Sequence, residues 1–186
     1  MENPKDIALD EIDLRLLDLL QHDASLTNQE LAARVHISPP TCLRRVKRLR
    51  EAGLIERHTA LLHTGRLAEL VGHGLDAVVE VSLDRQDAEA MEAFEARAIA
   101  DAQVQQCYRV SPGPDFVLIV HVADMPGYLA LAKRLFTQDA NVRNVKAFFS
   151  VKRAKFDPRI ALGRPTARAS TPPLTRPSPG ASSPRS

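Results

Sequence analysis

The chain has 186 residues, of which 44% are hydrophobic, and this length allows one domain or two small ones. Its net charge is +2, but four of the 25 basic residues lie in the stretch 163–186, which contains no acid. The first 162 residues therefore carry 21 basic and 23 acidic groups, so a prediction of nucleic-acid binding has to rest on a local patch rather than on overall charge.

Cysteine usage and the N-terminus indicate a cellular compartment. Cys42 and Cys107 form neither a metal-binding pattern nor a disulfide framework, and they fit a reducing cytoplasm. The acidic N-terminus lacks the apolar run of a signal peptide. No window approaches the ~20 apolar residues that a membrane-spanning helix needs. We therefore expect a soluble cytoplasmic protein without a membrane partner, a metal or a cofactor.

The N-terminal region predicts two short helices in series. Residues 10–22 place apolar side chains at helical spacing, and acids at their start suit the positive end of a helix. Further on, Thr27 and Glu30 have the spacing of a capping box. The second helix is therefore expected to begin at Asn28 and to end near Val35, where a three-residue turn follows.

A third helix is predicted in the stretch SPPTCLRRVKRLREAG. Ser38 is a good N-cap. Pro39 and Pro40 then occupy the first two helical positions, where the N–H group would have no partner within the helix. Gly53 is a natural stop for this helix.

These three helices, with a tight turn between the second and the third, predict a helix-turn-helix motif. At 100° per residue, Cys42, Val46 and Leu49 share the side of the third helix that can pack on the other two. The opposite side can enter the major groove of double-stranded DNA. In such helices the N-terminal residues meet base edges and flanking cations meet phosphates. The predicted DNA-binding residues are Thr41, Arg44 and Arg45 for bases, Lys47, Arg48 and Ser38 for phosphates, and Pro40 on the same face.

Two alternatives apply to this helix. Its charged face could be a solvated surface, although two capped helices joined by a short turn favour DNA binding. Cys42 could be a redox sensor, but its place on the packing side favours a small buried thiol.

After the third helix, the sequence changes to a mixture of strands and helices. The stretch LIERHTALLH predicts a short hinge strand, and residues 63–74, which contain three glycines, predict a linker. From Leu75 to Lys155 the predicted order is β-α-β-β-α-β, a ferredoxin-like pattern. Its elements are a strand at 75–83, a helix at 87–100, strands at 104–111 and 115–123, a helix at 124–136 with Asp124 as N-cap, and a strand at 142–153.

The final stretch, residues 163–186, has six Pro, five Ser and a single Leu. It cannot bury enough apolar surface to offset chain entropy, so we predict a disordered basic tail. The tail is either a spacer without a role or a source of weak, salt-sensitive DNA contacts through its four arginines.

From about Ala8 to Phe156 the sequence resembles the Lrp/AsnC family of bacterial transcriptional regulators. The similarity is carried by the motif S-P-x-x-C-x-x-R-V-x-R-L, by the helices before it, and by CYRVSPGPDFVLIVHVADM. It implies an α+β fold with a helix-turn-helix DNA-binding domain and hinge strand at 8–62, a linker at 63–74, and a βαββαβ effector-binding and oligomerisation domain at 75–156. It also implies homodimers that assemble further, often to octamers, and an amino acid as effector.

Two positions depart from the family pattern. The family has V-G-L-S before the third helix, whereas here His36 replaces the glycine, which adopts positive φ freely. In the second domain S-G-x-x-D-Y becomes SPGPDF, and Pro112 and Pro114 remove N–H groups that could bind a carboxylate. The resemblance implies effector-binding residues at Gly113, Asp115, Met125, Phe148, Phe149 and Ser150. Asp115 either meets an ammonium group or is a solvated turn residue, and the prolines leave open whether ligand binding is retained.

The sequence suggests three alternative functions. The first is a sequence-specific regulator that responds to a small effector. The second is an architectural DNA-binding protein without ligand control, which the altered loop and basic tail would favour. The third is an enzyme or enzyme subunit, but the six histidines are scattered without metal spacing and there is no phosphate-binding glycine loop. We therefore expect no catalytic residues.

Overall fold

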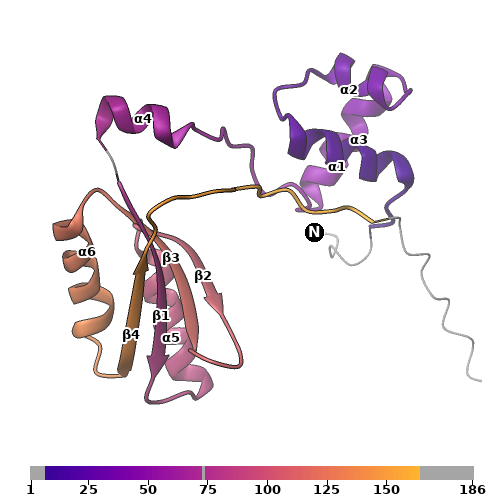
Figure 1. Cartoon of the computed structure of the whole chain (residues 1–186). Coiled ribbons are helices and arrows are strands. Elements are labelled where there is room, and N and C mark those ends of the chain that lie inside the picture. Colours follow the sequence, from indigo (N-terminus) through magenta and orange to yellow (C-terminus); the bar gives the residue numbers. More distant parts are fainter. Residues whose placement is uncertain (1–6, 73, 164–186) are drawn as a thin grey trace, which may run out of the picture. The chain divides into compact units, whose positions relative to one another are not determined.

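The computed structural model describes residues 7–72 and 74–163 (Figure 1). The chain forms two compact units, and it leaves the first at Thr59 and returns to it at Pro158. Nearly all of the predicted tail lies outside the described residues. Among the described residues, no helix is both long and apolar enough to cross a membrane.

Three helices form the first unit, and the start of the second confirms the predicted capping box. They are α1 (Glu11–His22), α2 (Asn28–Arg34) and α3 (Pro39–Glu51). At α1, Asp10 and Asp13 form a capping box, in which the Asp13 N–H donates to Asp10 Oδ1 over 2.9 Å. At α2, Thr27 and Glu30 form the capping box that their spacing predicts.

The start of α3 differs in detail from the prediction. Ser38 occupies the N-cap position, but its side chain makes no capping hydrogen bond. Its hydroxyl instead lies 2.8 Å from that of Thr41. His36, in the turn before α3, has φ 57°, so the positive φ expected where the family has glycine is confirmed.

The core of the first unit joins the three helices around one apolar cluster. Its buried members are Leu16, Leu31, Ala32, Val35, Cys42 and Leu49. Cys42 is fully buried, and this burial raises the pKa of its thiol. Since the thiolate is the reactive form of cysteine, the environment of Cys42 supports a packing role and not a redox role.

The second unit is a four-stranded antiparallel sheet in the order β2-β3-β1-β4. This confirms the predicted βαββαβ pattern. Its elements are β1 (Leu75–Leu83), α5 (Ala88–Ala100), β2 (Val104–Arg109), β3 (Phe116–Val122), α6 (Met125–Ala132) with a π-helical continuation η2 (Lys133–Thr137), and β4 (Val142–Phe149).

The sheet buries one of its faces. Alternate residues of β1 and β3, such as Val79 and Leu118, are fully buried with Phe94 of α5 and Leu131 of α6. The opposite face carries Val78, Tyr108 and Phe148, each more than a third exposed. In Figure 1, α5 lies behind the sheet. In the part of the chain that the structure describes, the helices that join this core, α5 and α6, lie on one face only.

Two segments between α3 and β1 have a structure that differs from the prediction. The hinge strand expected at 54–63 is absent, because a strand needs a hydrogen-bonded neighbour and no described segment pairs with it. The predicted linker at 63–74 contains a helix, α4 (Thr64–Val71). His63 caps this helix by accepting a hydrogen bond from the Arg66 N–H over 3.2 Å.

Candidate nucleic-acid interface and effector site

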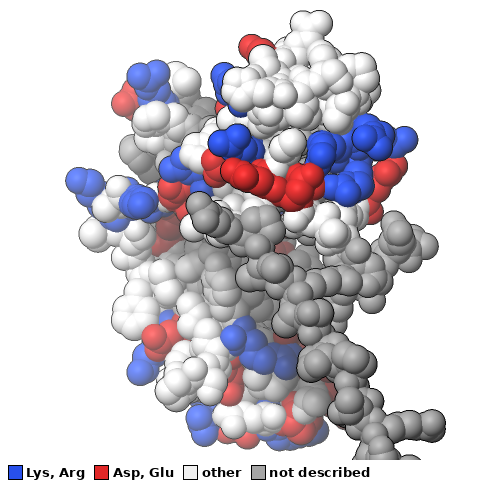
Figure 2. Space-filling view, turned by 90° about the vertical axis from the view of Figure 1, so that its right-hand side faces the viewer, with Lys and Arg blue, Asp and Glu red and all other residues white. Residues whose placement is uncertain are grey.

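The exposed face of α3 carries most of the residues predicted to contact DNA. Arg44 is exposed and makes no hydrogen bond or ion pair within the described part of the chain. Lys47 is exposed and lies 3.7 Å from the carboxylate of Glu51, one turn further along. Figure 2 shows basic side chains of the first unit gathered in patches beside acidic ones. The local concentration of charge on α3 therefore remains compatible with DNA binding.

Arg45 is engaged differently, because its guanidinium turns back to α1. Its Nη1 donates to Asp10 Oδ2 over 2.7 Å and to Asp13 Oδ1 over 2.8 Å. Arg48 donates through Nη2 to the other oxygen of Asp13. Asp13 has no exposed surface, and a buried carboxylate is tolerated only when it is paired. Arg45 and Arg48 provide that pairing.

These contacts also set the protonation of the groups involved. The Arg45 side chain donates hydrogen bonds to Asp10 and Asp13, and these bonds raise the pKa of Arg45. Burial raises the pKa of Asp10, but the Asp13 N–H and Arg45 more than offset this and hold it below its usual value. The Asp10 carboxylate and the Arg45 guanidinium are therefore both charged at neutral pH.

Sequence reasoning missed the role of Asp10 and Asp13 as partners of α3. A signal was present, because Asp13 lies three residues before Leu16 and so shares its face of α1. On α3, Arg45 lies only about 60° around the helix from Cys42, close to the packing side. A hydrogen bond between α2 and α3 was also missed. The side-chain amide of Asn28 donates to the Pro39 carbonyl over 2.8 Å and fixes the turn between these helices.

The residues implied for effector binding lie at two ends of the sheet. Gly113 and Asp115 lie in the loop between β2 and β3, and Gly113 has φ 125°, which favours glycine. Asp115 Oδ2 accepts a hydrogen bond from the Leu83 N–H over 2.6 Å, and its N–H donates to the Val81 carbonyl over 2.9 Å. One oxygen of Asp115 therefore holds this loop on the end of β1, so Asp115 is not a purely solvated turn residue.

The remaining effector residues lie at the opposite end. Met125 begins α6, and the Ser150 N–H donates to the Asp76 carbonyl over 2.8 Å near the start of β1. Phe148 and Phe149 point to opposite faces of β4, because Phe149 packs on Tyr128 beneath the sheet with 4.9 Å between ring centroids. The seven residues of β3 separate the two ends by about 20 Å. A single chain therefore does not bring the six residues together.

Ser150 also lines a cavity that sequence reasoning did not find. This cavity, of about 720 Å³, lies between α4 and the end of the sheet. His121 and Asp76 line it too, and His121 Nδ1 lies 2.7 Å from Asp76 Oδ1. Within the described residues there is no cluster of three or more side chains that could hold a metal ion.

Both units match family models. A winged helix-turn-helix DNA-binding model matches residues 9–56, and the Lrp/AsnC ligand binding domain model matches residues 76–160. The chain belongs to the Lrp/AsnC family. Among its relatives, a leucine-responsive regulatory protein of Haemophilus influenzae is 34% identical over 83% of this chain and 91% of its own length. That of Rhizobium meliloti is 36% identical over 80% of this chain and 93% of its own length.

Solved structures of transcriptional regulators agree with this assignment. A transcriptional regulator from Neisseria meningitidis, solved as a complex with L-methionine, superposes with a TM-score of 0.71 at 29% identity, covering 83% of this chain and 97% of its own. The leucine response regulatory protein of Mycobacterium tuberculosis gives a TM-score of 0.67 at 28% identity, covering 82% and 99%. The helix-turn-helix and α+β predictions are confirmed, and this Lrp/AsnC protein is a DNA-binding transcriptional regulator.

Proposed function

We propose that this protein acts in the cytoplasm as a sequence-specific regulator whose DNA binding or assembly responds to an amino acid. The observation that carries the proposal is an exposed basic face on a capped helix-turn-helix, joined in one chain to a ligand-binding domain. The L-methionine complex of the Neisseria meningitidis relative supports an amino acid as the class of effector. A ligand that binds one assembly better than another shifts the population, and with it promoter occupancy.

The proposed DNA contacts follow the exposed face of α3. Thr41, in its first turn, is proposed to meet base edges. Arg45 contributes mainly by fixing α3 to α1, since Asp10 and Asp13 hold its guanidinium. The other proposed contacts to DNA are those of Ser38, Pro40, Arg44, Lys47 and Arg48.

The proposed effector site and the proposed assembly depend on each other. Gly113 and Asp115 lie a full strand length from Met125 and Ser150, so a shared ligand site requires loops from two copies of the chain. On the uncovered sheet face, the exposed side chains of Val78 and Phe148 lie opposite each other and offer an apolar contact for a homodimer. We propose dimers that associate further, up to octamers, with the amino acid held between subunits.

Thermal unfolding with a panel of amino acids tests effector control. A ligand of the native state at 100 times its dissociation constant adds about 2.7 kcal/mol to stability, which raises the melting temperature. The same amino acid should change affinity for a DNA sequence selected from a random pool. If selection yields such a sequence but no amino acid shifts the melting temperature, the architectural alternative without ligand control is favoured.

A further inference from the structure

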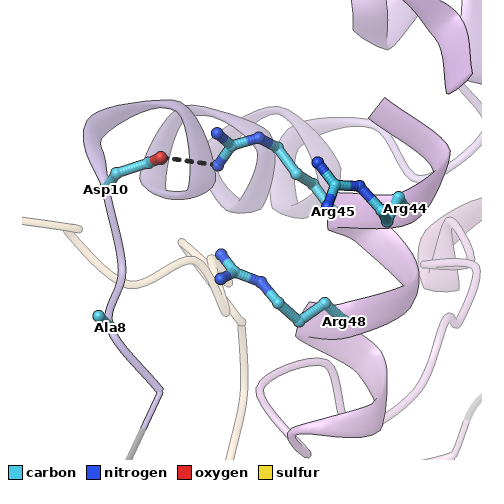
Figure 3. A pocket seen from close by; sticks show the side chains of 5 residues that line it. All are labelled: Ala8, Asp10, Arg44, Arg45 and Arg48. Carbon is cyan, nitrogen blue, oxygen red and sulfur yellow. Dashed lines mark hydrogen bonds and ion pairs between the residues drawn. The ribbon is translucent and has the colours of Figure 1, made fainter. Parts of the chain in front are cut away.

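A small cavity lies where α3 meets the segment that leads into α1. It measures about 150 Å³ and is lined by Ala8, Asp10, Arg44, Arg45 and Arg48 (Figure 3). A water molecule takes up about 30 Å³ in the liquid, so the cavity has room for a group of several atoms. Since three of its four charged lining side chains are arginines, its chemistry favours an anion.

The three guanidinium groups are held to different degrees. Arg45 is bonded to Asp10 and Asp13, Arg48 is bonded to Asp13, and Arg44 makes no hydrogen bond or ion pair within the described ranges. Three cations face two acids here, which leaves a local excess of positive charge. Arg44 and the remaining N–H groups of Arg48 are therefore available to a ligand.

Arg45 is held in place at the wall of this cavity. Its Nε lacks a hydrogen-bond partner among the described residues, but it has almost no accessible surface, so only the outer part of the guanidinium can meet a ligand. Because Asp10 and Asp13 fix the guanidinium through Nη1, this cation is oriented before any ligand arrives.

We propose that Arg44, Arg45 and Arg48 form a binding site for one phosphate group, and that the DNA backbone supplies it. Guanidinium groups match the oxygens of a phosphate in pairs, which makes arginine suited to this role. The inference rests on the proposed DNA-binding function. It assigns Arg44 and Arg45 to the backbone in place of the base contacts that the sequence pattern predicts, and leaves Thr41 as the proposed base contact.

Salt dependence of DNA binding tests the site directly. Binding of the full chain to a selected target duplex and to a shuffled duplex would be measured between 50 and 200 mM salt, because each phosphate contact contributes about 0.9 to the slope of log affinity against log salt. Arg44→Ala should lower that slope by about 1 and weaken both duplexes alike, roughly tenfold. Arg50→Ala is the matched control, since Arg50 is exposed on α3 but does not line the cavity, and it should leave the slope unchanged.

Two outcomes would overturn the proposal. If Arg44→Ala loses affinity for the target duplex only, Arg44 contacts a base. If Arg44→Ala and Arg50→Ala lose the same amount of affinity, the loss reflects the net charge of the protein and there is no specific site. If the wild-type chain binds both duplexes equally, sequence-specific regulation is contradicted, yet the salt slopes of Arg44→Ala and Arg50→Ala still test the cavity.

Inorganic phosphate identifies the source of the group. DNA binding would be compared in sodium chloride and sodium phosphate at equal ionic strength. If both salts act alike on the wild type while Arg44→Ala lowers the slope, the DNA backbone is the occupant. If sodium phosphate weakens DNA binding by the wild type more than it weakens DNA binding by Arg44→Ala, free phosphate occupies the same site and competes with DNA. If the variant changes neither the slope nor the response to phosphate, there is no phosphate site.

Discussion

Arg45 connects α3 to a fully buried carboxylate on α1, and this gives the residue a measurable structural role. Arg45→Ala should destabilise the first unit by about 3 kcal/mol, because it leaves the buried Asp13 carboxylate with Arg48 as its one remaining charged partner among the described residues. Arg44→Ala, which removes an exposed cation from the next position, should change stability by less than about 0.5 kcal/mol. Urea unfolding of the two variants measures the difference, and equal stabilities would show that the Arg45–Asp13 contact does not hold α3 in place.

A second residue-scale pair links α5 to η2. Asp101 accepts a hydrogen bond from Arg134 Nη2 over 2.8 Å. Burial raises the pKa of Asp101, but Arg134 and the Gln103 N–H more than offset this and lower it below its usual value. Ionised Asp101 therefore stabilises the fold above the pKa of the unfolded chain, near 4, and this contribution is lost as pH falls through the lower folded pKa.

Asp101→Asn tests this pH dependence. The variant should unfold at a lower denaturant concentration than the wild type at pH 7. This difference in unfolding midpoint should become smaller as pH falls below about 4. Asp84→Asn changes an exposed carboxylate and serves as the control. A constant gap across the pH range would show that ionisation of Asp101 does not contribute.

At the scale of single residues, local chemistry was predictable and distant pairing was not. The spacing of Thr27 and Glu30 predicted the start of α2, because residues three positions apart at a helix start can form a capping box. The positive φ of His36 was expected only from the resemblance, because the family has a glycine at this position. Arg45 and Asp13 are 32 residues apart, so their contact depends on how α1 and α3 pack, which sequence spacing does not specify.

Among the elements, the strands of the sheet were predicted well. The predicted and observed bounds of β1 are the same, and along most of β1 fully buried residues alternate with less buried ones, because only one face of the sheet is covered. The segment at 54–63 has strand-like residues, yet strand formation depends on a partner that the described chain does not provide. The helix α4 was missed because its glycines, Gly65 and Gly72, resemble a linker, although Gly72 ends the helix at φ 92°.

The segment that follows the second unit is bonded to α1, and sequence gave no sign of it. The Gln21 Nε2 donates to the Ile160 carbonyl over 2.8 Å, and the Ile160 N–H donates to Gln21 Oε1 over 3.0 Å. Gln21→Ala removes both bonds and should speed amide exchange at Ile160, with less than about 0.5 kcal/mol lost in global stability because the contact is exposed.

Hydrogen exchange and limited proteolysis of residues 158–163 measure the effect of Gln21→Ala. Gln21→Glu retains the acceptor for the Ile160 N–H but loses the donor, so its exchange rate at Ile160 should fall between those of the wild type and Gln21→Ala. If all three proteins exchange Ile160 at the same rate, the segment is not held by Gln21 in solution.

For the whole molecule, the two matched domains predict that the first unit binds DNA and that the second binds a ligand and pairs with a second copy of the chain. The sequence identified both units, because helix caps and strand alternation are local signals. The assembly was implied only by resemblance. The proposed assembly would use the sheet face with Val78, Tyr108 and Phe148, and it would also bring together the proposed effector residues from opposite ends of β3.

Val78→Lys tests the proposed dimer. Val78 lies opposite Phe148 in the sheet register, and a lysine there would place a charge in this exposed apolar pair. The variant should sediment as a monomer at concentrations where the wild type is dimeric. Ile99→Lys, which adds the same charge at an exposed apolar position of α5, should leave the dimer intact.

DNA binding by the same variants extends the test to function. In a two-fold dimer both helix-turn-helix units contribute to a palindromic site, so Val78→Lys should lose affinity for a full site. Its affinity for an isolated half-site should stay close to that of the wild type, because α3 is unchanged. A monomeric Val78→Lys that still binds the full site as tightly as the wild type would show that regulation does not depend on pairing through this face.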